Sequence, residues 1–146
     1  MLKKISNIGD CGITCDFGDE VDKKTNKEVI KLFNFIQESV KNKKIKGILN
    51  YTPSYNKLII NFDLGEVQSK EVIEFIKSGD YSKTIFSERN KLVEIPICYD
   101  AEFALDIKRL EEKTKLNFDE IIKEHLSTEF FVYMIGFVPG QPFLGD

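Results

Sequence analysis

The C-terminal end of the chain carries an apolar run, Phe130–Leu144, that contains no charged residue. Two glycines and two prolines interrupt its second half, which excludes a membrane-spanning helix of about 20 continuous apolar residues. The first half, Phe130–Ile135, instead has the composition of a buried β-strand. A lone strand exposes unpaired backbone groups at both edges and aromatic side chains on its faces. We therefore expect the chain to end inside a domain, and the run to need partners that the sequence does not contain.

The whole chain has the composition of a globular protein. Its 146 residues suffice for one domain, or for a small domain and part of another. Hydrophobic residues make up 42% and charged residues 31%, and the net charge of -3 gives no general attraction to nucleic acid. No apolar segment of a signal peptide follows Met1, and the cysteines are sparse and odd in number. Both features favour a reducing compartment, the cytoplasm.

Residues 1–90 have the pattern of a small α/β domain. Alternating side chains indicate strands with one buried face, which is formed by Ile13, Cys15 and Phe17 in one strand and by Leu58, Ile60 and Phe62 in another. The expected strands cover residues 13–17, 47–51, 57–63 and 93–99, and the expected helices cover 25–46 and 69–78. The order strand, helix, strand, strand, helix, strand predicts a ferredoxin-like arrangement. The polar stretch 79–90 predicts a linker or an exposed loop, so we place the domain boundary after residue 90.

Local signals predict how these helices begin, end and pack. Thr25 and Glu28 fit a capping box, in which the hydroxyl and the carboxylate bind free backbone N–H groups. Gly79 is expected to end the second helix. The apolar residues of the first helix fall on one face at helical spacing. These residues are Val29, Leu32, Phe33, Ile36 and Val40.

Residues 91–146 predict two short helices, a strand and a loop, so the overall class is α+β. Phe103, Ile107 and Leu110 suit the first helix, and Asn117 is expected to cap the second. Four side chains of the second helix are expected to face inward, namely Ile121, Ile122, His125 and Leu126. Two helices and one strand cannot close a core, so we expect residues 91–146 to be an incomplete domain.

Two residue types suggest chemistry. Cys11 and Cys15 have a spacing that invites a metal site, but structural zinc usually takes four ligands, and ordinary buried cysteines are the better interpretation. His125 is the only histidine, so any histidine-based acid–base step must use it. A partly buried histidine bonded to backbone remains the alternative.

The glycine- and proline-rich segment Gly136–Gly145 is the densest signal of the chain. Glycine allows close backbone approach and proline stiffens a loop, so the segment can present backbone amides to an anionic group. A tight turn between two strands is the alternative. The sequence contains no Walker A loop, no dinucleotide-binding glycine motif and no nucleophile elbow.

Four segments of the chain resemble the allophanate hydrolase subunit 1 family, which includes the B-type component of bacterial 5-oxoprolinase and the kinase inhibitor KipI. They are Gly9–Asp19, Thr52–Leu58, Ile95–Asp106 and His125–Gly145. The last is similar to the family's His-x-x-x-x-Tyr-x-Val-Tyr-Met-Leu-Gly-Phe-x-Pro-Gly motif in both order and spacing. The chain departs from the family pattern at Asp100-Ala101, Ala104-Leu105 and Gln141.

The resemblance implies a fold and a function. The fold is a small α/β domain followed by a cyclophilin-like β-barrel, of which residues 91–146 would be the incomplete start. The implied function is that of the B-type component of an ATP-dependent 5-oxoprolinase, a hydrolase complex that uses C-type and A-type subunits as well to convert 5-oxo-L-proline to L-glutamate. ATP would be bound by the complex and not by a P-loop of this chain.

Other functions stay open on the sequence alone. A KipI-like inhibitor of a sensor histidine kinase would share the fold and the motifs, as would a protein related to allophanate hydrolase or urea carboxylase. Self-association through the C-terminal strand is a further possibility, because a second copy would pair an orphan edge. No membrane or nucleic-acid partner is expected.

The resemblance and the residue types together nominate a set of site residues. We expect His125 to be catalytic. The residues expected to bind substrate are Phe137, Pro139 and Gly140 of the loop, with Tyr99 and Glu102 as further members. No metal ligand is expected.

Overall fold

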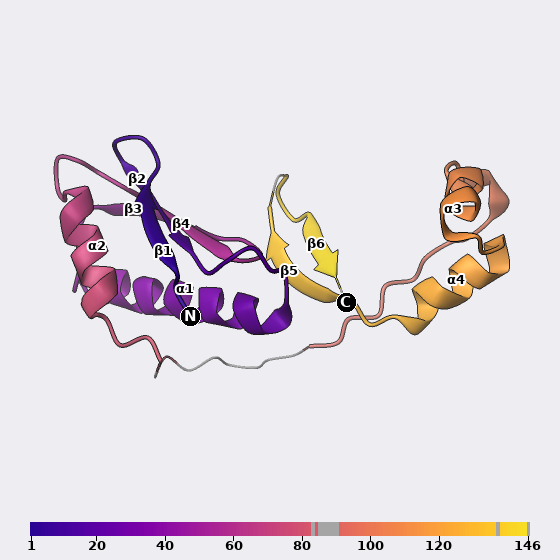
Figure 1. The fold of residues 1–146 in the computed structure, drawn as a ribbon, viewed down its shortest axis with the longest axis horizontal. Helices are drawn as coiled ribbons and strands as arrows, with labels where there is room; N and C mark the ends of the chain where they lie inside the picture. Colours follow the sequence, from indigo (N-terminus) through magenta and orange to yellow (C-terminus); the bar gives the residue numbers. More distant parts are fainter. Residues whose placement is uncertain (83, 85–90, 137, 146) are drawn as a thin grey trace. The chain divides into compact units, whose positions relative to one another are not determined.

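The computed structural model describes residues 1–82, 84, 91–136 and 138–145 (Figure 1). The chain forms two compact units, and each is described by itself. The first contains Met1–Ser87 and Val132–Leu144, and the second contains Glu88–Phe131 and Gly145–Asp146. These units group residues by contact, so the two domains expected from the sequence, 1–90 and 91–146, stay a prediction.

The first unit contains an antiparallel four-stranded sheet in the order β1-β2-β4-β3. Its strands are β1 (Lys4–Asn7), β2 (Gly12–Asp16), β3 (Ile48–Pro53) and β4 (Lys57–Phe62). Helix α1 (Lys23–Lys41) connects β2 to β3 and packs against β3 and β4 (Figure 1). Helix α2 (Ser69–Ser78) follows β4. The central strands β2 and β4 are therefore paired on both edges, whereas β1 and β3 form the edges of the sheet.

The strand predicted at residues 93–99 is wrong, because residues 91–100 form no strand. A ferredoxin-like sheet places its last strand antiparallel to the first strand of the pattern, which here is β2. That edge of β2 is already filled by β1, which pairs antiparallel through Lys4↔Asp16 and Ile5↔Cys15. Pro96 also lacks the N–H that a ladder needs. The edge of β2 that residues 93–99 would take in a ferredoxin-like sheet is therefore already occupied.

A single apolar core lies between this sheet and its two helices. The predicted inward faces are confirmed for α1 and β4, since Leu32, Ile36 and Ile60 are all fully buried. Burying one such side chain contributes about 1.5–3 kcal/mol before chain entropy is subtracted. The core residues are Ile13, Cys15, Phe17, Val29, Leu32, Ile36, Leu58, Ile60, Phe62, Val67, Val72 and Ile76.

The cysteines of the chain are free thiols in two different environments. Cys15 is buried in the core, and burial raises the pKa of its thiol to about 12, which makes it unreactive near neutral pH. Cys11 is exposed, so the interpretation of this pair as buried cysteines is right for Cys15 and wrong for Cys11. Among the residues that the structure describes, no cluster of three or more His, Cys, Asp or Glu side chains could hold a metal ion.

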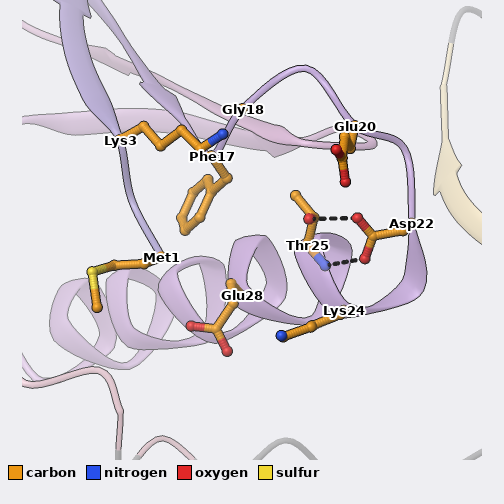
Figure 2. A pocket seen from close by; sticks show the side chains of 9 residues that line it. All are labelled: Met1, Lys3, Phe17, Gly18, Glu20, Asp22, Lys24, Thr25 and Glu28. Carbon is orange, nitrogen blue, oxygen red and sulfur yellow. Dashed lines mark hydrogen bonds between the residues drawn. The ribbon is translucent and has the colours of Figure 1, made fainter.

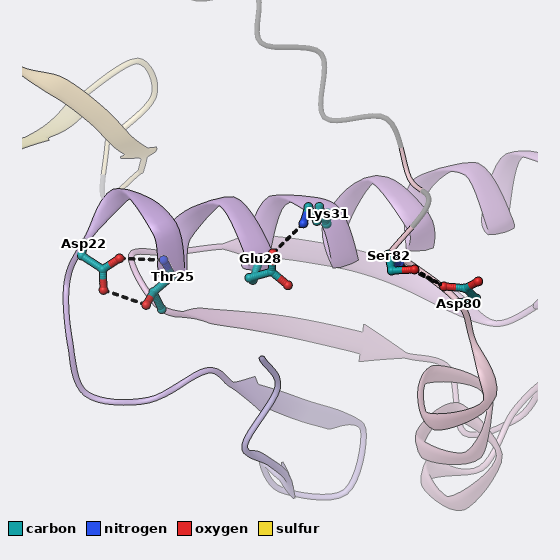
Figure 3. Close-up of polar contacts among 6 residues, drawn as sticks. All are labelled: Asp22, Thr25, Glu28, Lys31, Asp80 and Ser82. Atoms are coloured by element: carbon teal, nitrogen blue, oxygen red, sulfur yellow. Dashed lines mark hydrogen bonds and ion pairs between the residues drawn. The ribbon is translucent and has the colours of Figure 1, made fainter.

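The N-terminal cap of α1 is Asp22 and not Thr25, the residue that the sequence pattern favours (Figure 3). The Asp22 carboxylate accepts hydrogen bonds of 2.8 Å from both the backbone N–H and the side-chain hydroxyl of Thr25. An aspartate accepts from the third helical N–H as well as a threonine does, and here it lies at the right distance from the first turn. Glu28 pairs with Lys31 at 2.6 Å and does not complete a capping box.

Gly79 ends α2 as predicted, but for a different reason. Its φ of -75° is in the ordinary extended range, so left-handed backbone does not require glycine here. A Cβ at Gly79 would instead lie 2.5 Å from the Cζ atom of the Phe35 ring. Glycine is needed because the chain passes directly over an aromatic ring of α1.

The second unit is helical. It contains the short 3-10 helix η1 (Ala101–Phe103), α3 (Ile107–Thr114) and α4 (Phe118–Ser127). The predicted cap of α4 is confirmed, since Asn117 and Glu120 form a reciprocal capping box. His125 and Leu126 were expected to face inward, and both are exposed. This amphipathic helix therefore keeps part of its apolar face uncovered within its own unit.

The predicted strand at the start of the apolar run is confirmed as β5 (Phe131–Ile135). It pairs with β6 (Pro142–Gly145), a strand that the sequence did not predict, in a separate two-stranded sheet. No barrel is formed by the part of the chain that the structure describes. Within the same ranges, no helix is both long and apolar enough to cross a membrane.

The Asp22 cap predicts a pH-dependent stability. Hydrogen bonds from Thr25 lower the pKa of Asp22 below its ordinary value of 3.8. Because the folded-state pKa is the lower one, the stabilisation is present above that ordinary value and is lost as the pH falls through the folded pKa. We expect Asp22→Ala to lower the thermal midpoint at pH 7, and the difference from wild type to shrink below about pH 3.

Thermal unfolding followed by circular dichroism over this pH range measures the effect. Asp19→Ala, at an exposed aspartate three residues earlier, is the matched control and should leave the midpoint unchanged. A loss in Asp22→Ala that is equal at pH 7 and at low pH would contradict the assigned cap.

Candidate functional site

The residues nominated from the sequence fall in both units. His125, Tyr99 and Glu102 belong to the second unit, whereas Pro139 and Gly140 belong to the first. Phe137 lies outside the described residues. The two groups are therefore described separately.

The second unit brings Tyr99 and His125 together. The Tyr99 hydroxyl lies 2.6 Å from Nδ1 of His125, and the two rings meet nearly edge to face at 83°. The Phe130 ring lies on another part of the histidine, with ring centroids 5.4 Å apart. His125 occupies the last turn of α4, where the helix dipole favours a positive charge. The imidazole is thus oriented by one hydrogen bond and one aromatic neighbour.

This hydrogen bond decides which nitrogen of His125 can do chemistry. In the neutral tautomer protonated on Nε2 the Tyr99 hydroxyl donates to Nδ1, and in the tautomer protonated on Nδ1 that N–H donates to the Tyr99 oxygen. In the protonated ring Nδ1 donates to the Tyr99 oxygen, and Nε2 again remains available. Nε2 makes no hydrogen bond with the residues that the structure describes. An exposed, oriented imidazole of this kind can serve as a general acid or a general base.

Glu102 does not join this pair through a hydrogen bond or an ion pair. It lies in η1 and is exposed, and neither kind of contact connects its side chain to the rest of the described chain. The structure therefore supports the pairing of Tyr99 with His125 and leaves the role of Glu102 a prediction.

The glycine- and proline-rich segment forms the turn between β5 and β6. Its ends are joined by a hydrogen bond of 3.0 Å from the Gly136 N–H to the Gln141 carbonyl, and the Gln141 N–H donates to Val138 at 3.1 Å. Gly140 has a φ of +85°, a conformation that favours glycine. Of the two interpretations of this segment, the turn between strands is the one that the structure describes. A role for Pro139 and Gly140 in binding substrate stays a prediction.

One buried polar residue of the first unit was missed from the sequence. Asn26 is 2% exposed, and its Nδ2 donates to the carbonyl oxygens of Ser54 at 3.1 Å, Tyr55 at 3.1 Å and Tyr133 at 3.2 Å. A signal was present, because Asn26 lies three residues before Val29 on the buried face of α1. A polar side chain in register with an apolar stripe must find partners inside the protein.

The first unit also contains a cavity of about 340 Å³ beside the start of α1 (Figure 2). Phe17 lines it together with charged side chains of both signs, including Lys3, Lys24 and Glu20. Two of its carboxylates are already engaged, since Asp22 caps α1 and Glu28 pairs with Lys31. The lining thus selects no single ligand charge, and none of the nominated site residues lies in it.

The sequence profile of the carboxyltransferase domain, subdomains C and D, matches residues 3–146. The chain belongs to this family. It is 31% identical over 154 aligned residues to the 5-oxoprolinase B subunit of Bacillus subtilis (strain 168), in a match that covers 97% of the chain. It is 22% identical over 100 residues to the 5-oxoprolinase B subunit of Escherichia coli O157:H7, in a match that covers 68% of the chain. The resemblance inferred from the motifs is therefore confirmed at the level of the family.

The chain spans only part of these relatives, 62% of the Bacillus protein and 46% of the Escherichia protein. Among solved structures, it is similar to TTHA0988, with a TM-score of 0.71, 25% identity and coverage of 92% of this chain and 25% of that one. It is also similar to the Kluyveromyces lactis urea amidolyase, with a TM-score of 0.64 over 94% of this chain and 10% of that chain. At 14% identity the latter likeness concerns the fold alone.

The hydrogen bond between Tyr99 and His125 predicts the state of the histidine ring. In Tyr99→Phe, we expect the ratio of the two neutral tautomers to change, because the hydroxyl partner of Nδ1 is gone. Nitrogen-15 NMR of the imidazole measures this without ambiguity, since the chain has one histidine.

Tyr81→Phe is the control, because the Tyr81 ring lies against Phe35 and not against His125. The assigned contact is refuted if the tautomer populations of Tyr99→Phe and the wild type are the same.

Proposed function

We propose that this chain acts as the B-type component of an ATP-dependent 5-oxoprolinase that converts 5-oxo-L-proline to L-glutamate. The observation that carries the proposal is its 31% identity to the 5-oxoprolinase B subunit of Bacillus subtilis over 97% of the chain. Membership of the carboxyltransferase domain family over residues 3–146 supports the same assignment.

The chemistry of the substrate explains what such a component must supply. 5-Oxoproline is a lactam, and its amide is a poor electrophile until its oxygen is activated, for which phosphorylation by ATP is the natural means. Addition of water to the activated carbon then gives a tetrahedral, anionic intermediate that still carries the phosphoryl group. Breaking of its C–N bond requires a proton for the leaving nitrogen and gives an acyl phosphate. Hydrolysis of this acyl phosphate releases inorganic phosphate and L-glutamate. Backbone N–H groups can stabilise the anionic oxygen of the intermediate, and a histidine can supply the proton to the leaving nitrogen.

Residues of this chain match both needs. His125 presents Nε2 as the group that would give a proton to the leaving nitrogen, and Tyr99 would hold the ring in place through Nδ1. In the turn, the N–H groups of Gly136, Val138 and Gln141 already donate to backbone carbonyls, and Pro139 has none. The Gly140 N–H would therefore be the group that the described part of the turn contributes toward the anionic oxygen. Tyr99 would thus act through His125 rather than on the substrate itself.

ATP and the remaining binding groups would come from partner subunits. The chain has no Walker A loop, so we assign ATP binding to the complex with A-type and C-type subunits. The alternative of a KipI-like kinase inhibitor stays a prediction from the motifs.

The test mixes this chain with the A-type and C-type subunits encoded in the same genome. With ATP present we expect 5-oxo-L-proline to yield L-glutamate, measured by an amino-acid assay. His125→Gln should lower turnover by about 10²-fold or more, the usual contribution of a general acid. Lys123→Gln, at an exposed position of the same helix, should retain activity.

Two outcomes would count against the proposal. One is the absence of glutamate from a mixture that has assembled into a complex. The other is full activity in His125→Gln, which would contradict the proposed role of His125 in the reaction. That result would not contradict the assignment of the chain to a 5-oxoprolinase complex.

A further inference from the structure

A buried side-chain amide of α1 binds the β5–β6 hairpin to the N-terminal sheet. Asn26 of α1 reaches the carbonyls of Ser54 and Tyr55, in the connection between β3 and β4, and the carbonyl of Tyr133 in β5. Tyr133 lies 107 residues away in the sequence and is 4% exposed. All of these residues belong to the first compact unit. The contact therefore links a helix near the N-terminus to a strand near the C-terminus within one compact unit.

The donor chemistry at this point is specific to an amide. The Nδ2 group has two hydrogens and three carbonyl acceptors at 3.1–3.2 Å, so at least one hydrogen is shared. An aspartate of the same shape would direct carboxylate oxygens at three carbonyl oxygens. Removal of the donors would leave buried carbonyls without this partner, which is costly away from water. Asparagine is therefore the residue type that this position needs.

An aromatic cluster fastens both strands of the hairpin beside the amide. The Tyr55 ring lies 5.3 Å from the Tyr133 ring of β5. It also meets the Phe143 ring of β6 edge to face, at 6.2 Å and 84°. Such ring pairs contribute beyond the area that they bury. One tyrosine of the β3–β4 connection thus contacts both strands.

These anchors lie close to the glycine- and proline-rich turn. Tyr133 precedes Gly136 by three residues and Phe143 follows Gln141 by two, and the Gly136–Gln141 hydrogen bond closes the turn between them. Ring contacts on both strands at this distance constrain where the Gly136–Gln141 hydrogen bond lies. The orientation of the turn, with Pro139 and Gly140, is therefore set by α1 and by the β3–β4 connection.

We propose that Asn26 and Tyr55 are positioning residues for the Gly136–Gln141 turn, which gives the N-terminal sheet a direct part in shaping the site. They act through the turn and not on the substrate. The effect on turnover rests on the proposed 5-oxoprolinase function, whereas the effect on the turn itself does not.

Backbone hydrogen exchange of this chain, followed by mass spectrometry or NMR, tests the positioning. In Asn26→Asp we expect the amides of β5 and β6 to exchange about tenfold faster or more, while the amides of β2 and β4 keep their protection. Phe143→Leu keeps an apolar side chain but removes the edge-on ring contact, and should loosen the same hairpin amides. Asn34→Asp, in the same helix, is the matched control and should change neither set.

The inference is overturned if hairpin exchange is unchanged in both variants. It is also overturned if β2 and β4 accelerate as much as the hairpin, because Asn26 would then contribute only to global stability. If Asn26→Asp does not fold, the test uses Phe143→Leu and compares the exchange of its hairpin amides with that of the β2 and β4 amides.

Turnover in the mixture with A-type and C-type subunits gives the second readout. We expect Asn26→Asp to lower kcat about tenfold with little change in KM, since a displaced turn weakens binding of the intermediate more than of the substrate. An unchanged kcat in the folded complex that contains Asn26→Asp would refute a role of Asn26 in catalysis. If the wild-type mixture makes no glutamate, the proposed function fails, and the exchange result alone judges the positioning of the turn.

Discussion

The buried amide of Asn26 is the constraint on which the arrangement of the first unit depends. Three carbonyl groups from two distant parts of the chain converge on one nitrogen, and the site is almost closed to solvent. Each hydrogen bond of this kind adds only about 0.5–1.5 kcal/mol net, but leaving its buried partner unsatisfied costs more. The contact therefore selects one docking geometry for the hairpin more than it adds to overall stability. Apolar packing alone, which is not directional, would not fix that geometry.

The sheet beneath this contact depends on a second constraint, the pairing of both central strands. β2 and β4 carry fully buried side chains such as Ile13, Leu58 and Ile60, and α1 packs against β4. β1 closes the open edge of β2, which a later strand would take in a ferredoxin-like order. The apolar core and the edge pairing together make a rigid support, and a rigid support is what allows α1 to hold a hairpin through one side chain.

Much of the secondary structure could be predicted from the sequence, because the helices and the central strands of the sheet have regular periodicity. The bounds of α2, the inward face of β4 and the cap of α4 at Asn117 all follow from local patterns. The choice between Asp22 and Thr25 as the cap of α1 did not, since both residue types accept the same hydrogen bond. Local signals give the element, and its exact first residue depends on the path of the preceding loop.

The features that the sequence did not reveal are those decided by non-local competition. The alternating residues 93–99 look like a strand, but β1 occupies the edge that they would need. The four residues of β6 lie in a segment rich in glycine and proline, so periodicity could not identify them as a strand. Asn26 looked like one more polar residue of a helix, and its three partners are defined only once the fold has formed.

The sequence nominated His125 and Tyr99 separately, and the structure adds that the Tyr99 hydroxyl contacts Nδ1 of His125. The roles of both residues stay predictions. The expectation that His125 faces inward was wrong, because the apolar face of α4 stays partly uncovered in its own unit. Helical periodicity shows which residues share a face, and it does not show what covers that face.

The most direct test of the central claim is an isotope-edited NMR spectrum of the Asn26 side-chain amide. The account predicts cross-peaks from the Nδ2 protons to protons of Tyr55 and of Tyr133, and slow exchange of these protons with water. The absence of cross-peaks to Tyr133, in a sample whose contacts between α1 and β4 are intact, would contradict it.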